Sequence, residues 1–230
     1  MNISGLQKLT LLDFPGKLAC TIFTAGCNFR CPFCHNASLV LPEQARHMET
    51  DEVISFLKKR EGILEGVCIT GGEPCLQSDL EDFILNVRSM GFLVKLDTNG
   101  SFPEKLSSLI EKGLLDYVAM DIKTSKEKYL KVCGISNDNF LRNVMKSVEI
   151  LKSSKVEHEF RTTTARELQT REDFEKIGEW LKGEKHFFIQ QYETSGELVG
   201  EEMTPYEKDE LLTFADIMRH FVTDVEVRGV

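Results

Sequence analysis

Three cysteines, Cys27, Cys31 and Cys34, are the residues of this 230-residue chain best suited to chemistry. They stand close together in a short stretch that Pro32 keeps from forming a regular helix. Three thiolates in one loop can bind a metal centre together. An iron–sulfur cluster ordinarily takes four cysteines, so three would leave one iron open to a substrate.

Structural zinc is the alternative for this loop. Zinc usually takes four protein ligands, and the sequence offers no second pair of cysteines at a suitable spacing. His35 could supply the fourth ligand, although its adjacency to Cys34 strains a tetrahedral site. The cysteine spacing alone therefore leaves both kinds of site open.

The other four of the seven cysteines are scattered along the chain. Cys20, Cys68 and Cys133 lie in or beside apolar stretches, which predicts small buried hydrophobic side chains. Cys75 follows a Gly-Gly-Glu-Pro turn, and we predict a packing role for it as well. An odd count of cysteines without a secretory context indicates metal binding in a reducing cytoplasm rather than disulfides.

Polar residues also stand where three predicted strands end. Residues 71–73 (Gly-Gly-Glu) combine glycines that let backbone approach a ligand with a carboxylate that can accept hydrogen bonds from an ammonium group. Residues 97–100 (Asp-Thr-Asn-Gly) and 121–123 (Asp-Ile-Lys) end the next two strands. Each segment taken alone could be an ordinary turn. Together they would direct carboxylate, hydroxyl, amide and ammonium groups toward one mouth.

Alternating strands and helices must position these groups. Apolar or β-branched runs predict six strands, at residues 19–24, 67–70, 92–96, 117–122, 157–163 and 187–191. Between them, Ser78 and Glu81 predict a capping box for a helix that ends at Gly91. Further helices are expected from Pro103 to Gly113, from Thr170 to Gly183, and from residues 204–207 onward.

This alternation favours parallel strands joined by right-handed crossovers. Because a full eight-stranded barrel needs about 250 residues, we predict one α/β domain over residues 1–230, a partial (β/α)6 TIM-type barrel open on one side. A doubly wound sheet is the alternative. In either architecture the working residues lie at the carboxyl ends of the strands.

The charge balance limits the partners. Acidic residues outnumber basic ones by 37 to 28, so the surface as a whole repels phosphate backbones and anionic lipid. We therefore expect neither nucleic acid nor a membrane as a partner. No apolar run approaches the roughly 20 residues that cross a bilayer, which predicts a cytoplasmic protein.

The spacing cysteine, three residues, cysteine, two residues, cysteine, with Phe33 before the last cysteine, resembles the radical S-adenosylmethionine superfamily. The resemblance implies a [4Fe–4S] cluster, S-adenosylmethionine and a monovalent cation beside the carboxylate of that cofactor. The residues it implies are Cys27, Cys31 and Cys34 for the cluster; Phe33, Asn36, Gly71, Gly72, Glu73, Thr98, Asn99, Lys123 and Arg161 for S-adenosylmethionine; and Asp97, Thr98 and Asp121 for the cation.

The resemblance extends from residues 5–9 to residues 190–192 and is strongest to glycyl-radical activating enzymes, in particular the longer activating proteins of anaerobic ribonucleoside-triphosphate reductase. It implies reductive cleavage of S-adenosylmethionine and a glycyl radical on a partner, which we expect to be that reductase. A flavodoxin- or ferredoxin-type protein would supply the electron. Two alternatives stand beside it: a radical enzyme for a small molecule, like 7-carboxy-7-deazaguanine synthase, and a non-catalytic iron–sulfur or zinc module.

Overall fold

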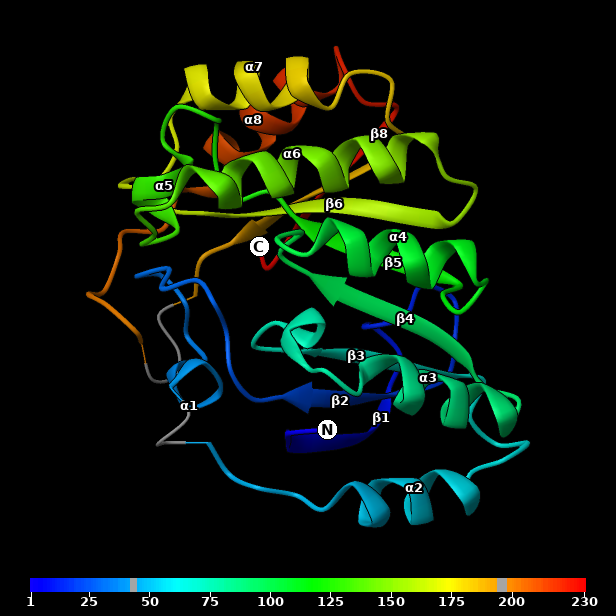
Figure 1. Cartoon of the computed structure of the whole chain (residues 1–230). Helices are drawn as coiled ribbons and strands as arrows, with labels where there is room; N and C mark the ends of the chain where they lie inside the picture. Colours follow the sequence, from blue (N-terminus) through cyan, green and yellow to red (C-terminus); the bar gives the residue numbers. More distant parts are fainter. Residues whose placement is uncertain (42–44, 194–197) are drawn as a thin grey trace.

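The computed structural model describes residues 1–41, 45–193 and 198–230. Eight strands form one sheet in chain order, so that β1 and β8 are its two edges (Figure 1). The strands are β1 (Ile3–Thr10), β2 (Ala19–Thr24), β3 (Gly66–Gly71), β4 (Leu93–Thr98), β5 (Tyr117–Asp121), β6 (Glu157–Thr164), β7 (His186–Gln191) and β8 (Asp224–Arg228).

The sheet is parallel from β2 to β8, and β1 pairs with β2 in the antiparallel direction. All six predicted strands are confirmed, each with ends within two residues of the prediction. Two edge strands, β1 and β8, were not predicted. The α/β class and the open, partial barrel are confirmed, because the two edge strands do not pair with each other.

Helices follow most strands and cover the outside of the curved sheet (Figure 1). They are α1 (Ala37–Val40), α2 (Thr50–Lys58), α3 (Leu80–Ser89), α4 (Pro103–Glu111), α5 (Tyr129–Val132), α6 (Asp138–Ser153), α7 (Arg171–Trp180) and α8 (Lys208–Met218), with a 3₁₀ turn, η1 (Pro74–Leu76). Pro103 is in the first turn of α4, as predicted. Among the described residues, no helix has both the length and the apolar character needed to cross a membrane.

The predicted capping box at Ser78 and Glu81 is wrong. Helix α3 starts one residue later, with Asp79 as N-cap and no side-chain cap bond, because the Asp79 carboxylate pairs with the N-terminal ammonium. A capping box does form at α7, between Thr170 and Asp173.

Side chains alternate between the two faces of each strand, and the alternation separates the core from the site. On β4, Val94 and Leu96 are fully buried in the hydrophobic core, whereas Lys95 and Asp97 are charged. The scattered cysteines Cys20, Cys68, Cys75 and Cys133 are all buried, which confirms that prediction. The barrel interior therefore carries polar groups, and the apolar face packs beneath the helices.

Candidate active site

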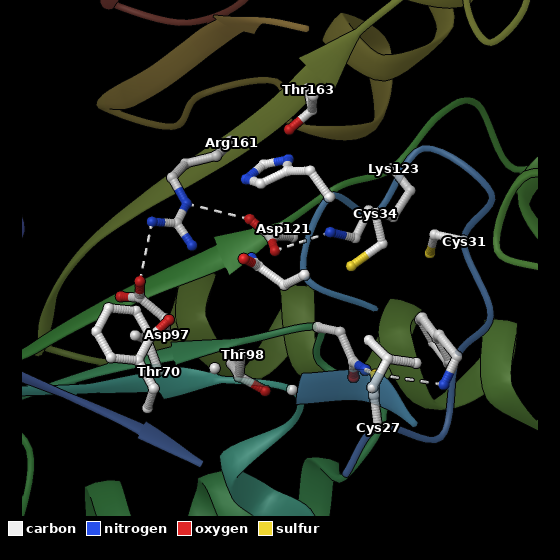
Figure 2. A pocket seen from close by; sticks show the side chains of 18 of the residues that line it. Cys27, Cys31, Cys34, Thr70, Asp97, Thr98, Asp121, Lys123, Arg161 and Thr163 are labelled. Carbon is white, nitrogen blue, oxygen red and sulfur yellow. Dashed lines mark hydrogen bonds and ion pairs between the residues drawn. The ribbon is translucent and has the colours of Figure 1, made fainter. Parts of the chain in front are cut away.

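A cavity of about 370 Å³ lies where β2 to β6 end (Figure 2). It is lined by every predicted site residue except Glu73. These residues are Cys27, Cys31, Phe33, Cys34, Asn36, Gly71, Gly72, Asp97, Thr98, Asn99, Asp121, Lys123 and Arg161. Segments far apart in the sequence thus converge on the loop that carries the cysteines.

The cysteine loop joins β2 to α1 and is held by its own backbone and by α5. The Arg30 amide donates to the Cys133 carbonyl at 2.9 Å. Two N–H groups point at the Cys27 sulfur, the Phe29 amide at 3.4 Å and the Asn99 side-chain amide at 3.8 Å. Hydrogen bonds to sulfur are one means by which proteins tune iron–sulfur clusters.

The three thiols differ in acidity. Burial raises the pKa of Cys27 to about 12 and also raises the pKa of Cys34. The adjacent Cys133 thiol, together with Lys123, holds the pKa of Cys31 below its usual range although burial opposes this. The Lys123 ammonium favours all three thiolates. Because metal binding requires thiolates, this lysine supports the binding of a cluster.

The described residues contain no group of three His, Cys, Asp or Glu side chains close enough together to hold a single metal ion. A zinc ion needs its ligand atoms within about 2.0–2.3 Å of one point. A four-iron cluster instead spreads its thiolates over separate irons. The three thiols around one cavity suit a cluster of this kind.

Gly71 and Gly72 bring the end of β3 against the cysteine loop. Gly71 has φ +116°, and a Cβ there would lie 2.4 Å from the Thr24 backbone nitrogen. A Cβ on Gly72 would lie 2.0 Å from the Gly26 carbonyl oxygen. Only glycine permits this contact, which leaves both glycines in the cavity wall.

Glu73 lies behind the cavity wall and is fully buried. Its Oε1 accepts hydrogen bonds from the Cys75 amide at 2.9 Å and from the Thr98 hydroxyl at 2.8 Å. Its Oε2 accepts one from the Asn99 amide at 2.7 Å. Burial raises the pKa of this carboxyl group, although these donors oppose the shift. Glu73 thus connects the ends of β3 and β4 through hydrogen bonds.

Charged side chains line the side of the cavity formed by β4, β5 and β6. Arg161 bridges two carboxylates, with its Nη1 3.1 Å from Asp97 and its Nε 3.1 Å from Asp121 (Figure 2). Lys123 contacts the other Asp121 oxygen at 2.9 Å and lies 5.7 Å from the centre of the Phe33 ring. The other Asp97 oxygen pairs with Lys95, which sequence reasoning missed.

These cations keep both carboxylates ionised. Burial favours the neutral acids, but Lys123 and Arg161 lower the pKa of Asp121 to about 2. Arg161 and Lys95 likewise hold the pKa of Asp97 below its usual range against the effect of burial. Three protein cations already surround the two carboxylates, so a further monovalent cation bound there would be attracted by two negative charges and repelled by three positive ones. The arrangement therefore fits the predicted monovalent cation poorly.

Several lining residues were not predicted. They are polar and come from strands and from the loop after β1: Gln7, Asp13, Thr21, Thr70, Thr163 and Gln190. Thr163 stands two residues after Arg161, so the alternation of strand faces could have found it. Asp13 lies in a loop, where it accepts a hydrogen bond from Thr21 at 2.5 Å, and no periodic signal identifies it.

Known proteins share these features. The sequence model of the Radical SAM superfamily matches residues 21–181. A Methanocaldococcus jannaschii protein, provisionally named a glycyl-radical enzyme activating enzyme, is 33% identical over 99% of this chain and 96% of its own length. The pyruvate formate-lyase-activating enzyme of Listeria monocytogenes is 31% identical over 59% of each chain.

The fold also has a solved counterpart. SuiB of Streptococcus suis, determined with S-adenosylmethionine bound, superposes with a TM-score of 0.65 over 88% of this chain and 48% of that one, at 14% identity. The chain belongs to the radical SAM superfamily. Its similarity over nearly the full length places it in the branch of glycyl-radical enzyme activating enzymes. Membership implies a [4Fe–4S] cluster and S-adenosylmethionine, and the cavity described above suits both.

Proposed function

We propose that this protein cleaves S-adenosylmethionine reductively and generates a glycyl radical on anaerobic ribonucleoside-triphosphate reductase. The observation that carries the proposal is the cavity in which three loop thiols face the ion-paired ends of β4, β5 and β6. The M. jannaschii relative supports an activating role, because its name describes that activity and the similarity covers nearly both chains.

Each group in the cavity has a defined task in this proposal. Cys27, Cys31 and Cys34 would hold the cluster, which would supply the electron and an open iron. The Arg161 guanidinium and the Lys123 ammonium suit the carboxylate of the ligand. The ionised Asp97 and Asp121 complement its positive charge. No side chain needs to act as a general acid or base.

The open barrel supports a protein substrate. The sheet leaves its β1 and β8 edges unpaired with each other. In this proposal an extended segment of the partner reaches the cavity from that open side. Glycine is a suitable target, since it has no side chain to prevent close approach and its backbone radical is stabilised by the flanking amides. We also propose a cytoplasmic location, a single domain, and a flavodoxin- or ferredoxin-type electron donor.

Electron paramagnetic resonance tests this function. Reduced, reconstituted protein is mixed anaerobically with S-adenosylmethionine and the anaerobic reductase of the same organism. We expect a doublet that collapses when the glycine Cα carries deuterium. Cys31→Ala should abolish the signal, whereas Cys20→Ala, at a buried cysteine on β2 outside the cavity, should retain it. Cleavage of S-adenosylmethionine without a doublet on an intact reductase would refute this partner.

A further inference from the structure

Lys95 is the least expected charged residue of the barrel interior. It lies on β4 and is only 2% exposed, a degree of burial that lysine almost never reaches unless it is paired. Its ammonium pairs with Asp97 and lies 3.9 Å from the Cys68 sulfur and 5.9 Å from the centre of the Tyr117 ring. Lys95 does not line the cavity but stands directly behind a carboxylate that does.

Each of the four carboxylate oxygens of Asp97 and Asp121 forms an ion pair with a protein cation. On Asp97, Oδ1 pairs with Lys95 and Oδ2 with Arg161. On Asp121, Oδ1 pairs with Arg161 and Oδ2 with Lys123. Monovalent cations bind through oxygen atoms, so an ion at this position would have to share these oxygens with three protein cations that already balance the two negative charges.

We propose that the Lys95 ammonium takes the place of the monovalent cation, so that this protein binds S-adenosylmethionine without one. Lys95 and Asp97 are two residues apart on one strand and therefore share a face, which fixes the positive charge beside the carboxylate. Lys95 is a positioning residue, because it contacts Asp97 and not the ligand. The inference rests on the proposed S-adenosylmethionine site and is independent of the identity of the partner.

The charge, rather than the bulk, of Lys95 should matter. In Lys95→Met, a side chain of similar length without charge would leave Asp97 Oδ1 free to bind an ion from solution. In Lys95→Arg, the charge remains. If Lys95 had only a structural role, the affinity of the Lys95→Met variant for S-adenosylmethionine would not depend on which salt is present. If Lys95 replaces an ion, sodium or potassium should restore the affinity of this variant.

The test is calorimetric binding of S-adenosylmethionine to anaerobically reconstituted protein in choline, sodium or potassium chloride at equal ionic strength. Wild-type affinity should change by less than about twofold among the salts. Lys95→Met should bind about tenfold more weakly in choline chloride and recover about fivefold in sodium or potassium chloride. Lys95→Arg should behave like wild type.

The matched control is Lys128→Met, which removes another ion-paired lysine, the partner of Asp173, outside the cavity. It should show no salt-specific effect. If Lys95→Met does not retain the cluster, thermal unfolding of the wild-type apo-protein in the same salts is the second measurement, and equal midpoints are expected.

Three results would overturn the inference: wild-type binding that needs sodium or potassium, an equal loss for Lys95→Met in all salts, or a salt-specific rise in the apo-protein midpoint. If the wild-type protein bound no S-adenosylmethionine in any of the salts, that result would instead refute the proposed function.

Discussion

The carboxylate of Glu73 shows how a single residue can shape the site without lining it. It holds the Asn99 amide and the Thr98 hydroxyl, and Thr98 and Asn99 both line the cavity. A buried carboxylate with three donors is expensive to disturb, because each donor left without a partner costs about 1–3 kcal/mol. Glu73 should therefore act on the ligand through the end of β4.

Glu73→Gln tests this role. One side-chain oxygen would become an NH₂ group facing donors, so we expect the free energy of unfolding to fall by about 1–3 kcal/mol. The affinity for S-adenosylmethionine should fall with it. Denaturant unfolding of the apo-protein and calorimetry of the reconstituted protein measure the two effects.

Glu81→Gln is the matched control, because Glu81 pairs with Lys112 at the surface and surface ion pairs contribute little. Glu73 would instead be a direct ligand contact if Glu73→Gln left stability unchanged and weakened only the binding of S-adenosylmethionine.

The sequence predicted which residues gather at the cavity but not the direction of each side chain. The carboxyl ends of parallel strands lie at the same end of the barrel, and this rule predicts that the thiols lie near the charges of Asp97, Asp121 and Arg161, as the structure has them. It failed for Glu73, because Gly71 turns the chain with a positive φ and breaks the alternation beyond β3. Lys95 was missed because its charge interrupts an apolar run, although its spacing from Asp97 indicated a shared face.

At the scale of elements, buried polar contacts connect neighbouring units of the barrel. Asp173 is 2% exposed and accepts hydrogen bonds from the Ser125 hydroxyl at 2.6 Å and from the Thr170 amide at 2.7 Å. It thereby joins the loop after β5 to the start of α7. The sequence identified where α7 begins, but the bond to Ser125 is long-range and has no local signal.

A second such contact joins β6 to the turn before β7. His158 Nε2 lies 2.7 Å from a Glu184 carboxylate oxygen, and its Nδ1 lies 2.9 Å from the Val156 carbonyl oxygen. Burial disfavours the imidazolium, but the bonds to Glu184 and Val156 outweigh it and raise the pKa of His158. The charged form is therefore the one that stabilises the fold.

This contact predicts a pH dependence. A histidine pKa that is higher in the folded than in the unfolded protein adds stability that is complete below about pH 6.5 and is lost as the pH rises through the folded-state value. The difference in free energy of unfolding between wild type and His158→Gln should therefore be larger at pH 6 than at pH 8.5. Urea unfolding of the apo-protein at both pH values measures this difference.

His186→Gln is the control, because His186 pairs with Asp224 at a more exposed position. A difference that grew with pH would contradict the assigned direction.

At the scale of the whole molecule, the sheet is wider than the sequence indicated. Strand β8 has five residues, of which Asp224, Glu226 and Arg228 are charged, so it lacks the apolar run that identified the other parallel strands. Strand β1 contains Gly5 and has two irregularities in its pairing with β2. Edge strands bury fewer side chains than central ones, which weakens their sequence signal. Both nevertheless extend the sheet on either side of the strands that carry the cavity.

The central claim is that Cys27, Cys31 and Cys34 leave one iron of a [4Fe–4S] cluster open for S-adenosylmethionine. Electron–nuclear double resonance of the reduced, reconstituted protein with S-adenosylmethionine labelled with ¹⁵N at its amino group and ¹³C at its carboxylate tests this claim most directly. We predict hyperfine coupling of both nuclei to the cluster spin, because amino and carboxylate groups would bind the open iron. A reduced cluster that binds S-adenosylmethionine but shows no coupling to either nucleus would contradict the claim.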